Sequence, residues 1–77
     1  MKILVLGSGC PKCRATEENV KKAVEKLGIQ AEVDHIFDVR EFPKYGVKLT
    51  PAVVVDGKVV VSGKVPTVEE LEKILSG

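Results

Sequence analysis

The two cysteines of the chain lie in the segment Cys10-Pro11-Lys12-Cys13, and no other residues are better suited to chemistry. Two thiols at this spacing can exchange with a substrate disulfide or bind a soft metal ion such as Cu(I). A closed zinc site needs four ligands, and beyond the cysteines the chain offers only His35 and carboxylates. Thiol–disulfide exchange and metal-ion delivery are therefore the two hypotheses to weigh.

A strand and a helix are predicted on either side of this motif. The run Lys2–Leu6 is short, apolar after its lysine and followed by glycine, which is typical of a strand buried on both faces. Beyond the motif an amphipathic helix is predicted, with Pro11 in its first turn and Gly28 at its end. Its buried stripe is expected to be Cys13, Thr16, Val20, Ala23, Val24 and Leu27.

This placement makes the two sulfurs unequal. Cys10 is expected just ahead of the first helical turn, where unpaired backbone N–H groups and the helix dipole lower the pKa of a thiol. The ammonium group of Lys12 would add to this effect by swinging toward the sulfur. Cys13 falls on the buried stripe, and burial raises the pKa of a thiol and limits its access. The pattern predicts Cys10 as the nucleophile and Cys13 as the resolving thiol.

The middle of the chain predicts a second strand and a short helix. Residues 29–37 alternate in polarity, and His35 is expected there as an ordinary strand-edge histidine rather than a ligand or base. Residues 38–45 predict a short helix, in which Glu41 would complete a capping box with the aspartate at position 38. Pro43 lies too far inside this segment for a regular helix.

The last third of the chain predicts a hairpin and a final helix. Two valine runs are joined by Asp56-Gly57, the strongest short-range hairpin signal. Thr67 and Glu70 form a capping box for a helix, with Pro66 and Leu71 as a hydrophobic staple. Its apolar face is expected to be Val68, Leu71, Ile74 and Leu75. The predicted order is β-α-β-α-β-β-α, an α/β fold with a four-stranded mixed sheet between helices.

These features resemble the thioredoxin family, in particular the very small thioredoxin/glutaredoxin-like proteins typical of archaea. The Cys-Pro-Lys-Cys motif after the first strand is similar to the redox motif of that family. Residues 45–52 (YGVKLTPA) are similar to a second family segment, which ends in proline and a small residue. Asp56-Gly57 and Gly63 also stand where the family has its hairpin turn and a later glycine. The resemblance covers nearly the whole chain.

The resemblance implies a thioredoxin-fold oxidoreductase that reduces protein disulfides through a Cys10–Cys13 disulfide, without another cofactor. It implies that Pro51 is a cis-proline facing the two sulfurs and that the backbone of Thr50 pairs with an extended substrate segment. The substrate-contacting set would be Pro11, Lys12, Thr50 and Pro51. The implied partners are disulfide-containing proteins and an electron donor, either a thioredoxin-reductase-like protein or glutathione.

The chain departs from the family pattern at several positions. Gly9 stands where thioredoxins usually have Trp, and the first strand lacks the buried acid that helps to deprotonate the second cysteine. Lys12 replaces the Tyr of glutaredoxins, and Ser62-Gly63 only partly resembles their glycine pair for glutathione. The proton acceptor for Cys13 and the electron donor are therefore left open. A Cu(I) chaperone is the rival, but its ferredoxin-like fold ends in a strand, whereas this chain ends in a predicted helix.

Composition narrows the remaining functions. The 77 residues predict one domain, residues 1–77, with 12 Lys+Arg against 11 Asp+Glu and a net charge of +1. That balance argues against nucleic-acid or membrane binding, and no Trp is present for base stacking. The apolar start is too short for a signal peptide, and no run would span a membrane. A monomer in the reducing cytoplasm is expected.

Overall fold

The computed structural model describes residues 1–7 and 11–76 of the chain. Along these residues, strands and helices follow one another in the order predicted from the sequence. They are β1 (Lys2–Leu6), α1 (Pro11–Leu27), β2 (Glu32–Ile36), the short helix η1 (Val39–Tyr45), β3 (Ala52–Val55), β4 (Lys58–Ser62) and α2 (Val68–Ser76).

The strands form one mixed sheet with the spatial order β2-β1-β3-β4. β1 and β2 run parallel, whereas β3 is antiparallel to both of its neighbours, β1 and β4. β1 and β3 hold the two central positions, so their apolar runs are buried on both faces. The predicted four-stranded mixed sheet between helices is confirmed.

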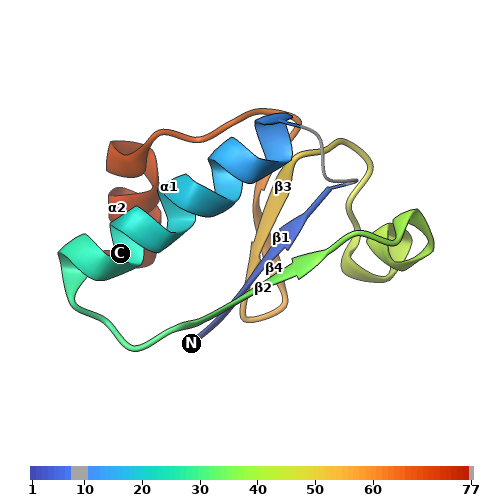
Figure 1. The fold of residues 1–77 in the computed structure, drawn as a ribbon. Helices are drawn as coiled ribbons and strands as arrows, with labels where there is room; N and C mark the ends of the chain where they lie inside the picture. The colour runs from blue at the N-terminus through green and yellow to red at the C-terminus, as the bar shows by residue number, and fades with distance from the viewer. Residues whose placement is uncertain (8–10, 77) are drawn as a thin grey trace.

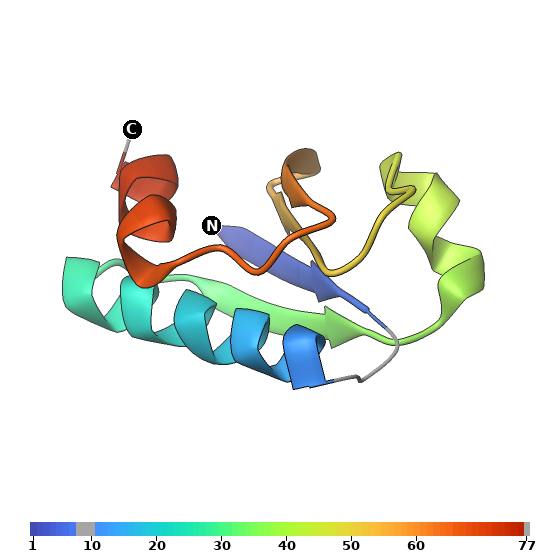
Figure 2. The same cartoon turned by 90° about the horizontal axis from the view of Figure 1, so that it is seen from above.

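Helices cover both faces of this sheet, as Figure 1 shows. α1 and α2 pack against each other on one face, and η1 lies on the opposite side, which is also visible from above in Figure 2. The core under α1 and α2 contains Ile3, Val5, Val20, Ala23, Val53, Val61, Leu71 and Leu75. The core on the η1 side contains Leu4, Leu6, Phe42, Val47, Ala52 and Val54.

The ends of the two long helices follow the predicted signals. Gly28 follows α1 with a positive φ of 64°, a conformation that favours glycine. At the start of α2, the Thr67 hydroxyl accepts from the Glu70 N–H at 3.1 Å, and the Glu70 carboxylate accepts from the Thr67 N–H at 3.2 Å. The Asn19 side chain donates to the Pro66 carbonyl at 2.8 Å, which ties α1 to the chain that enters α2.

The η1 segment differs in part from the predicted short helix. Asp38 caps it as expected, accepting from the Arg40 backbone N–H at 2.9 Å. The Glu41 carboxylate, however, pairs with Lys44 at 2.9 Å instead of completing a capping box. The segment is a 3₁₀ helix with Pro43 inside it, which agrees with the poor fit of this proline to a regular α-helix.

The β3–β4 hairpin is confirmed at Asp56-Gly57. Both turn residues have positive φ, 49° and 84°, the combination of a type I′ turn. The Asp56 carboxylate also accepts from the Lys2 N–H at 2.8 Å, so the turn is fixed to the start of β1. This places the opposite end of β3, which begins at Ala52, beside the end of β1.

Candidate active site

The site is built around Cys13, whose side chain is fully buried in the first turns of α1. Its sulfur lies against Gly7, the residue directly after β1. A Cβ added at Gly7 would overlap Cys13 Sγ and would lie 2.9 Å from Cys13 Cβ. The absence of a side chain at Gly7 is therefore what lets the sulfur approach the end of the strand. Cys10 lies outside the described residues, so its predicted position and activation stay predictions.

The first turn of α1 is held by Thr16, a buried polar residue of the predicted stripe. Its hydroxyl donates to the Lys12 backbone carbonyl at 2.8 Å, across one helical turn. The side chains of Pro11 and Lys12 are exposed, so both are accessible to a partner. The buried half of this turn thus carries Cys13 and the exposed half carries the residues expected to contact a substrate.

The loop before β3 carries the other predicted site residues. The Thr50–Pro51 peptide bond is cis, the isomer implied by the family resemblance. Pro51 is buried and Thr50 is exposed. The loop is fixed to the end of β4 on both sides of this bond: the Ser62 hydroxyl donates to the Leu49 carbonyl at 3.1 Å, and the Gly63 N–H donates to the Pro51 carbonyl at 3.0 Å.

The register of the sheet brings the loop before β3 and Cys13 to the same end of the sheet. Leu6 of β1 is paired with Ala52 of β3 in an antiparallel ladder. Gly7 directly follows Leu6 and Pro51 directly precedes Ala52, so both residues lie at the same end of the sheet. Since Cys13 Sγ packs on Gly7, the structure gathers Cys13 and the cis-proline at one end of the sheet.

His35 contacts Gly7, the residue on which Cys13 packs. The sequence did not indicate the burial of this histidine or its hydrogen-bond partners. His35 lies on the edge strand β2, as predicted, but its side chain is only 8% exposed. Its Nδ1 lies 3.2 Å from Glu17 Oε2, and its Nε2 lies 3.2 Å from the Gly7 carbonyl oxygen. The ring stacks on Phe37 with centroids 4.0 Å apart. A contact with α1 was not readable from the sequence, because it depends on how the helix packs across β2.

Glu17 is the charged partner in this cluster. Partial burial opposes ionisation of its carboxyl group, but hydrogen bonds and charges from His35 and Lys21 outweigh burial and hold the pKa of Glu17 below its ordinary value. Lys21 Nζ lies 3.5 Å from the other carboxylate oxygen. Glu17 is therefore an anion at neutral pH, and it is placed one helical turn after Cys13.

Apolar side chains are exposed around the same end of the sheet. Phe37 follows β2, Val39 opens η1 and Leu49 precedes the cis-proline loop, and each is more than 60% exposed. Leu49 also lies beside Gly63, whose added Cβ would be 3.1 Å from the leucine side chain. These residues give the site an apolar border that a partner protein can cover.

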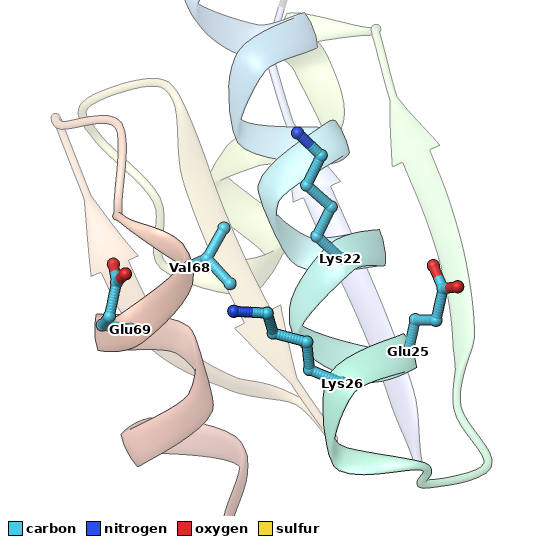
Figure 3. Close-up of a pocket in the computed structure, with 5 residues that line it drawn as sticks. All are labelled: Lys22, Glu25, Lys26, Val68 and Glu69. Atoms are coloured by element: carbon cyan, nitrogen blue, oxygen red, sulfur yellow. The ribbon is translucent and has the colours of Figure 1, made fainter.

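A hollow of about 560 Å³ lies between α1 and α2 and is shown in Figure 3. Lys22, Glu25 and Lys26 line it from α1, and Val68 and Glu69 line it from α2. Its nearest α1 residue is eleven positions beyond Pro11, or about 16 Å along the helix. This hollow is therefore separate from the site around Cys13.

Neither a metal-ligand cluster nor a membrane-spanning helix is found among the described residues. Within residues 1–7 and 11–76, no group of three or more His, Cys, Asp or Glu side chains is arranged to hold a metal ion. Cys10 lies outside these residues, so the two-thiol metal hypothesis is not tested by this result. No helix in the described part of the chain is long and apolar enough to cross a membrane.

Comparisons with known proteins match nearly the whole chain. Residues 1–76 match the family described as Thioredoxin domain. A curated protein named Thioredoxin from Methanocaldococcus jannaschii is 51% identical over 73 residues, covering 95% of this chain and 84% of that protein. A second, also named Thioredoxin, from Methanothermobacter thermautotrophicus is 40% identical over 76 residues, covering 99% of both chains.

Proposed function

The chain belongs to the thioredoxin-domain family and is a protein-disulfide oxidoreductase, and we propose that it works through the Cys10–Cys13 pair. Cys10 is the nucleophile and Cys13 the resolving thiol. The observation that carries this proposal is the position of Cys13 Sγ, which packs on Gly7 at the end of the sheet that also holds the cis-proline. A two-step exchange requires a second sulfur that is shielded from other reagents and lies close to the loop where the substrate docks.

The proposed reaction proceeds in two displacements. The Cys10 thiolate attacks one sulfur of a substrate disulfide, forms a mixed disulfide with it and expels the other substrate sulfur as a thiolate. Cys13 then gives up its proton, which in the balanced reaction ends on a released substrate thiolate, and attacks Cys10. The Cys10–Cys13 bond forms as the Cys10–substrate bond breaks, and the second substrate sulfur leaves. The substrate gains two electrons, and the protein is left as the disulfide.

Substrate docking is proposed at the loop before β3. The exposed Thr50 offers its backbone to an extended segment of the substrate, while Pro51, buried behind it, has no N–H to donate. The exposed Pro11 and Lys12 are proposed to complete this surface, with Lys12 as its charged residue, and the exposed Leu49 lies next to the loop as an apolar residue. Substrates are therefore expected to be proteins with an accessible disulfide in an extended segment.

The cycle needs an external source of electrons and no bound cofactor. A thioredoxin-reductase-like protein and glutathione are the two candidate donors for reducing the Cys10–Cys13 disulfide. Ser62 and Gly63, which partly resemble the glutathione-binding pair of glutaredoxins, are both hydrogen-bonded to the loop of residues 49–51. A monomer in the reducing cytoplasm fits this role, because a dithiol must be kept reduced to act as a reductant.

The test follows the release of nitrothiobenzoate from dithiobis-nitrobenzoate by the reduced protein in a stopped-flow instrument. The proposal expects two phases. The first, from Cys10, depends on reagent concentration, and the second, from Cys13, does not. Cys13→Ser should give only the first phase and accumulate a mixed disulfide visible by mass spectrometry, whereas Cys10→Ser should lose the fast phase.

Two outcomes would count against the proposal. One is a single phase in the unaltered protein that Cys13→Ser leaves unchanged. The other is equal alkylation of both cysteines by iodoacetamide across pH, which would show no activated nucleophile. Either outcome, with tight Cu(I) binding that needs both cysteines, would favour the metal-delivery alternative.

A further inference from the structure

The imidazole of His35 lies between two hydrogen-bond acceptors, one on Glu17 and one on Gly7. His35 Nδ1 faces the Glu17 carboxylate and His35 Nε2 faces the Gly7 carbonyl, each at 3.2 Å. A backbone carbonyl can only accept, and Glu17 can only accept as an anion. Both contacts are hydrogen bonds at once only when both ring nitrogens carry a proton. The geometry therefore accommodates the positively charged imidazolium form of His35.

The charged groups around this ring come from few elements. α1 supplies Glu17, with Lys21 on its second oxygen at 3.5 Å. β1 supplies no charge on this face, since the register partner of His35 is Val5. The neighbouring Asp34 of β2 points to the other face of the sheet, because successive side chains of a strand alternate between faces. Among residues 1–7 and 11–76, Glu17 is thus the one anion paired with His35.

Gly7 connects this ring to the cysteine. Its N–H donates to the Ile36 carbonyl of β2 at 3.0 Å, and its carbonyl accepts from His35. The same residue forms the surface on which Cys13 Sγ packs. β2 therefore holds both backbone polar groups of Gly7, the residue that supports the sulfur: the Ile36 carbonyl accepts from its N–H, and the His35 ring faces its carbonyl.

We propose that His35, held by Glu17, is a positioning residue for the resolving cysteine: it fixes the Gly7 backbone against Cys13, and its charge sets the pH dependence of the Cys13 step. This inference rests on the proposed two-thiol mechanism. His35 takes no proton in the net reaction. In its charged form it favours the Cys13 thiolate through the adjoining Gly7 peptide, and loss of its proton removes both the charge and one of the two ring hydrogen bonds.

Three variants separate charge from packing. His35→Gln keeps an N–H donor that can reach the Gly7 carbonyl but carries no charge. Glu17→Gln keeps an acceptor for Nδ1 and removes the anion. Glu72→Gln is the matched control, because its side chain is 28% exposed against 26% for Glu17 and it also pairs with a lysine, Lys26 at 4.0 Å.

The measurement is the rate of the second, Cys13-dependent phase with dithiobis-nitrobenzoate, from about pH 5 to 8, where imidazoles change charge. At the acid end, the unaltered protein should be about threefold faster than His35→Gln, a modest effect because Glu17 offsets much of the charge. The ratio should fall toward one at the alkaline end. Glu17→Gln should alter this profile, since it removes the anion that faces the ring. Glu72→Gln should match the unaltered protein.

A ratio between the unaltered protein and His35→Gln that stays constant with pH would overturn the inference. So would identical profiles for Glu17→Gln and Glu72→Gln, and this comparison decides the matter where circular dichroism shows His35→Gln to be unfolded. The first phase, from Cys10, is the internal reference. Loss of the second phase in the unaltered protein would instead refute the two-thiol mechanism, and this inference would fall with it.

Discussion

Gly7→Ala is the substitution that tests the geometry of the site most directly. The added Cβ would overlap Cys13 Sγ and would lie 2.9 Å from Cys13 Cβ. Gly7 is not among the glycines with positive φ, so alanine is compatible with its backbone and the cost is a steric one. The structure therefore assigns the effect to one neighbouring residue, Cys13, and predicts that removing its sulfur should relieve most of the overlap.

The magnitude follows from two opposing contributions. Adding a methyl group to a packed site costs about 1–3 kcal/mol in the free energy of unfolding. Replacing glycine by alanine at a compatible backbone position recovers about 0.4–1 kcal/mol from the unfolded chain. In a Cys13→Ala background the Sγ overlap is absent and only the Cβ contact remains. We expect Gly7→Ala to be at least about 1 kcal/mol more costly with Cys13 present, or roughly 4–8 °C in Tm.

The assay is a double-mutant cycle from urea denaturation of the reduced proteins, followed by circular dichroism because the chain has no Trp. Gly28→Ala is the control. Its φ of 64° makes alanine strained, but nothing lies within 4 Å of the added Cβ, so its cost should be the same with and without the Cys13→Ala substitution. Equal costs of Gly7→Ala in both backgrounds would refute the placement of Cys13 Sγ on Gly7.

Three further outcomes are expected. Thr67→Ala should lower the free energy of unfolding by about 0.5–2 kcal/mol, since it removes the acceptor for the Glu70 N–H, while Thr67→Ser should keep most of it; urea midpoints measure both. Leu49→Ala should lower kcat/KM for a protein disulfide about fivefold, near 1 kcal/mol, and leave the rate with dithiobis-nitrobenzoate unchanged; equal losses with both substrates would contradict apolar docking at Leu49. The pKa of Glu17 is lowered in the folded protein, so its ionised form adds stability above the ordinary value of 4.5 that is lost as the pH falls through the folded value. The stability difference from Glu17→Gln should therefore shrink on acidification, and a pH-independent difference in urea midpoints would argue against the His35 pairing.

Local signals in the sequence were sufficient for the elements that position the cysteines. The stripe of α1 placed Cys13 in the core, Gly28 ended the helix and the Thr67–Glu70 capping box began α2, because each depends on residues a few positions apart. The hairpin at Asp56-Gly57 was predictable for the same reason. These features follow from local chemistry, and the fold confirms them.

Features that depend on contacts between elements were not predictable in this way. No local pattern specifies the register of β2 against β1, so the pairing of His35 with Val5, and hence its direction toward α1, was not visible. The preference of Glu41 for Lys44 over the cap depended on side chains that compete within one turn. The only signal for the Glu17–His35 pair was the position of Glu17 four residues after Cys13, which does not by itself name a partner on another strand.

The Glu17–His35 pair bears on one departure of this chain from the thioredoxin pattern, the missing buried acid in the first strand. Its first strand, buried and wholly apolar from Ile3 to Leu6, has no acid near the second cysteine. A charged side chain near this end of the first strand comes from α1 instead: Glu17 pairs with His35 of β2, and His35 contacts the Gly7 carbonyl. The Glu17 side chain keeps 26% of its surface exposed, so its charge needs less desolvation than an acid inside a central strand. A 77-residue chain with a small core can therefore keep its central strands apolar and still place a histidine–carboxylate pair in contact with Gly7, the residue on which Cys13 packs.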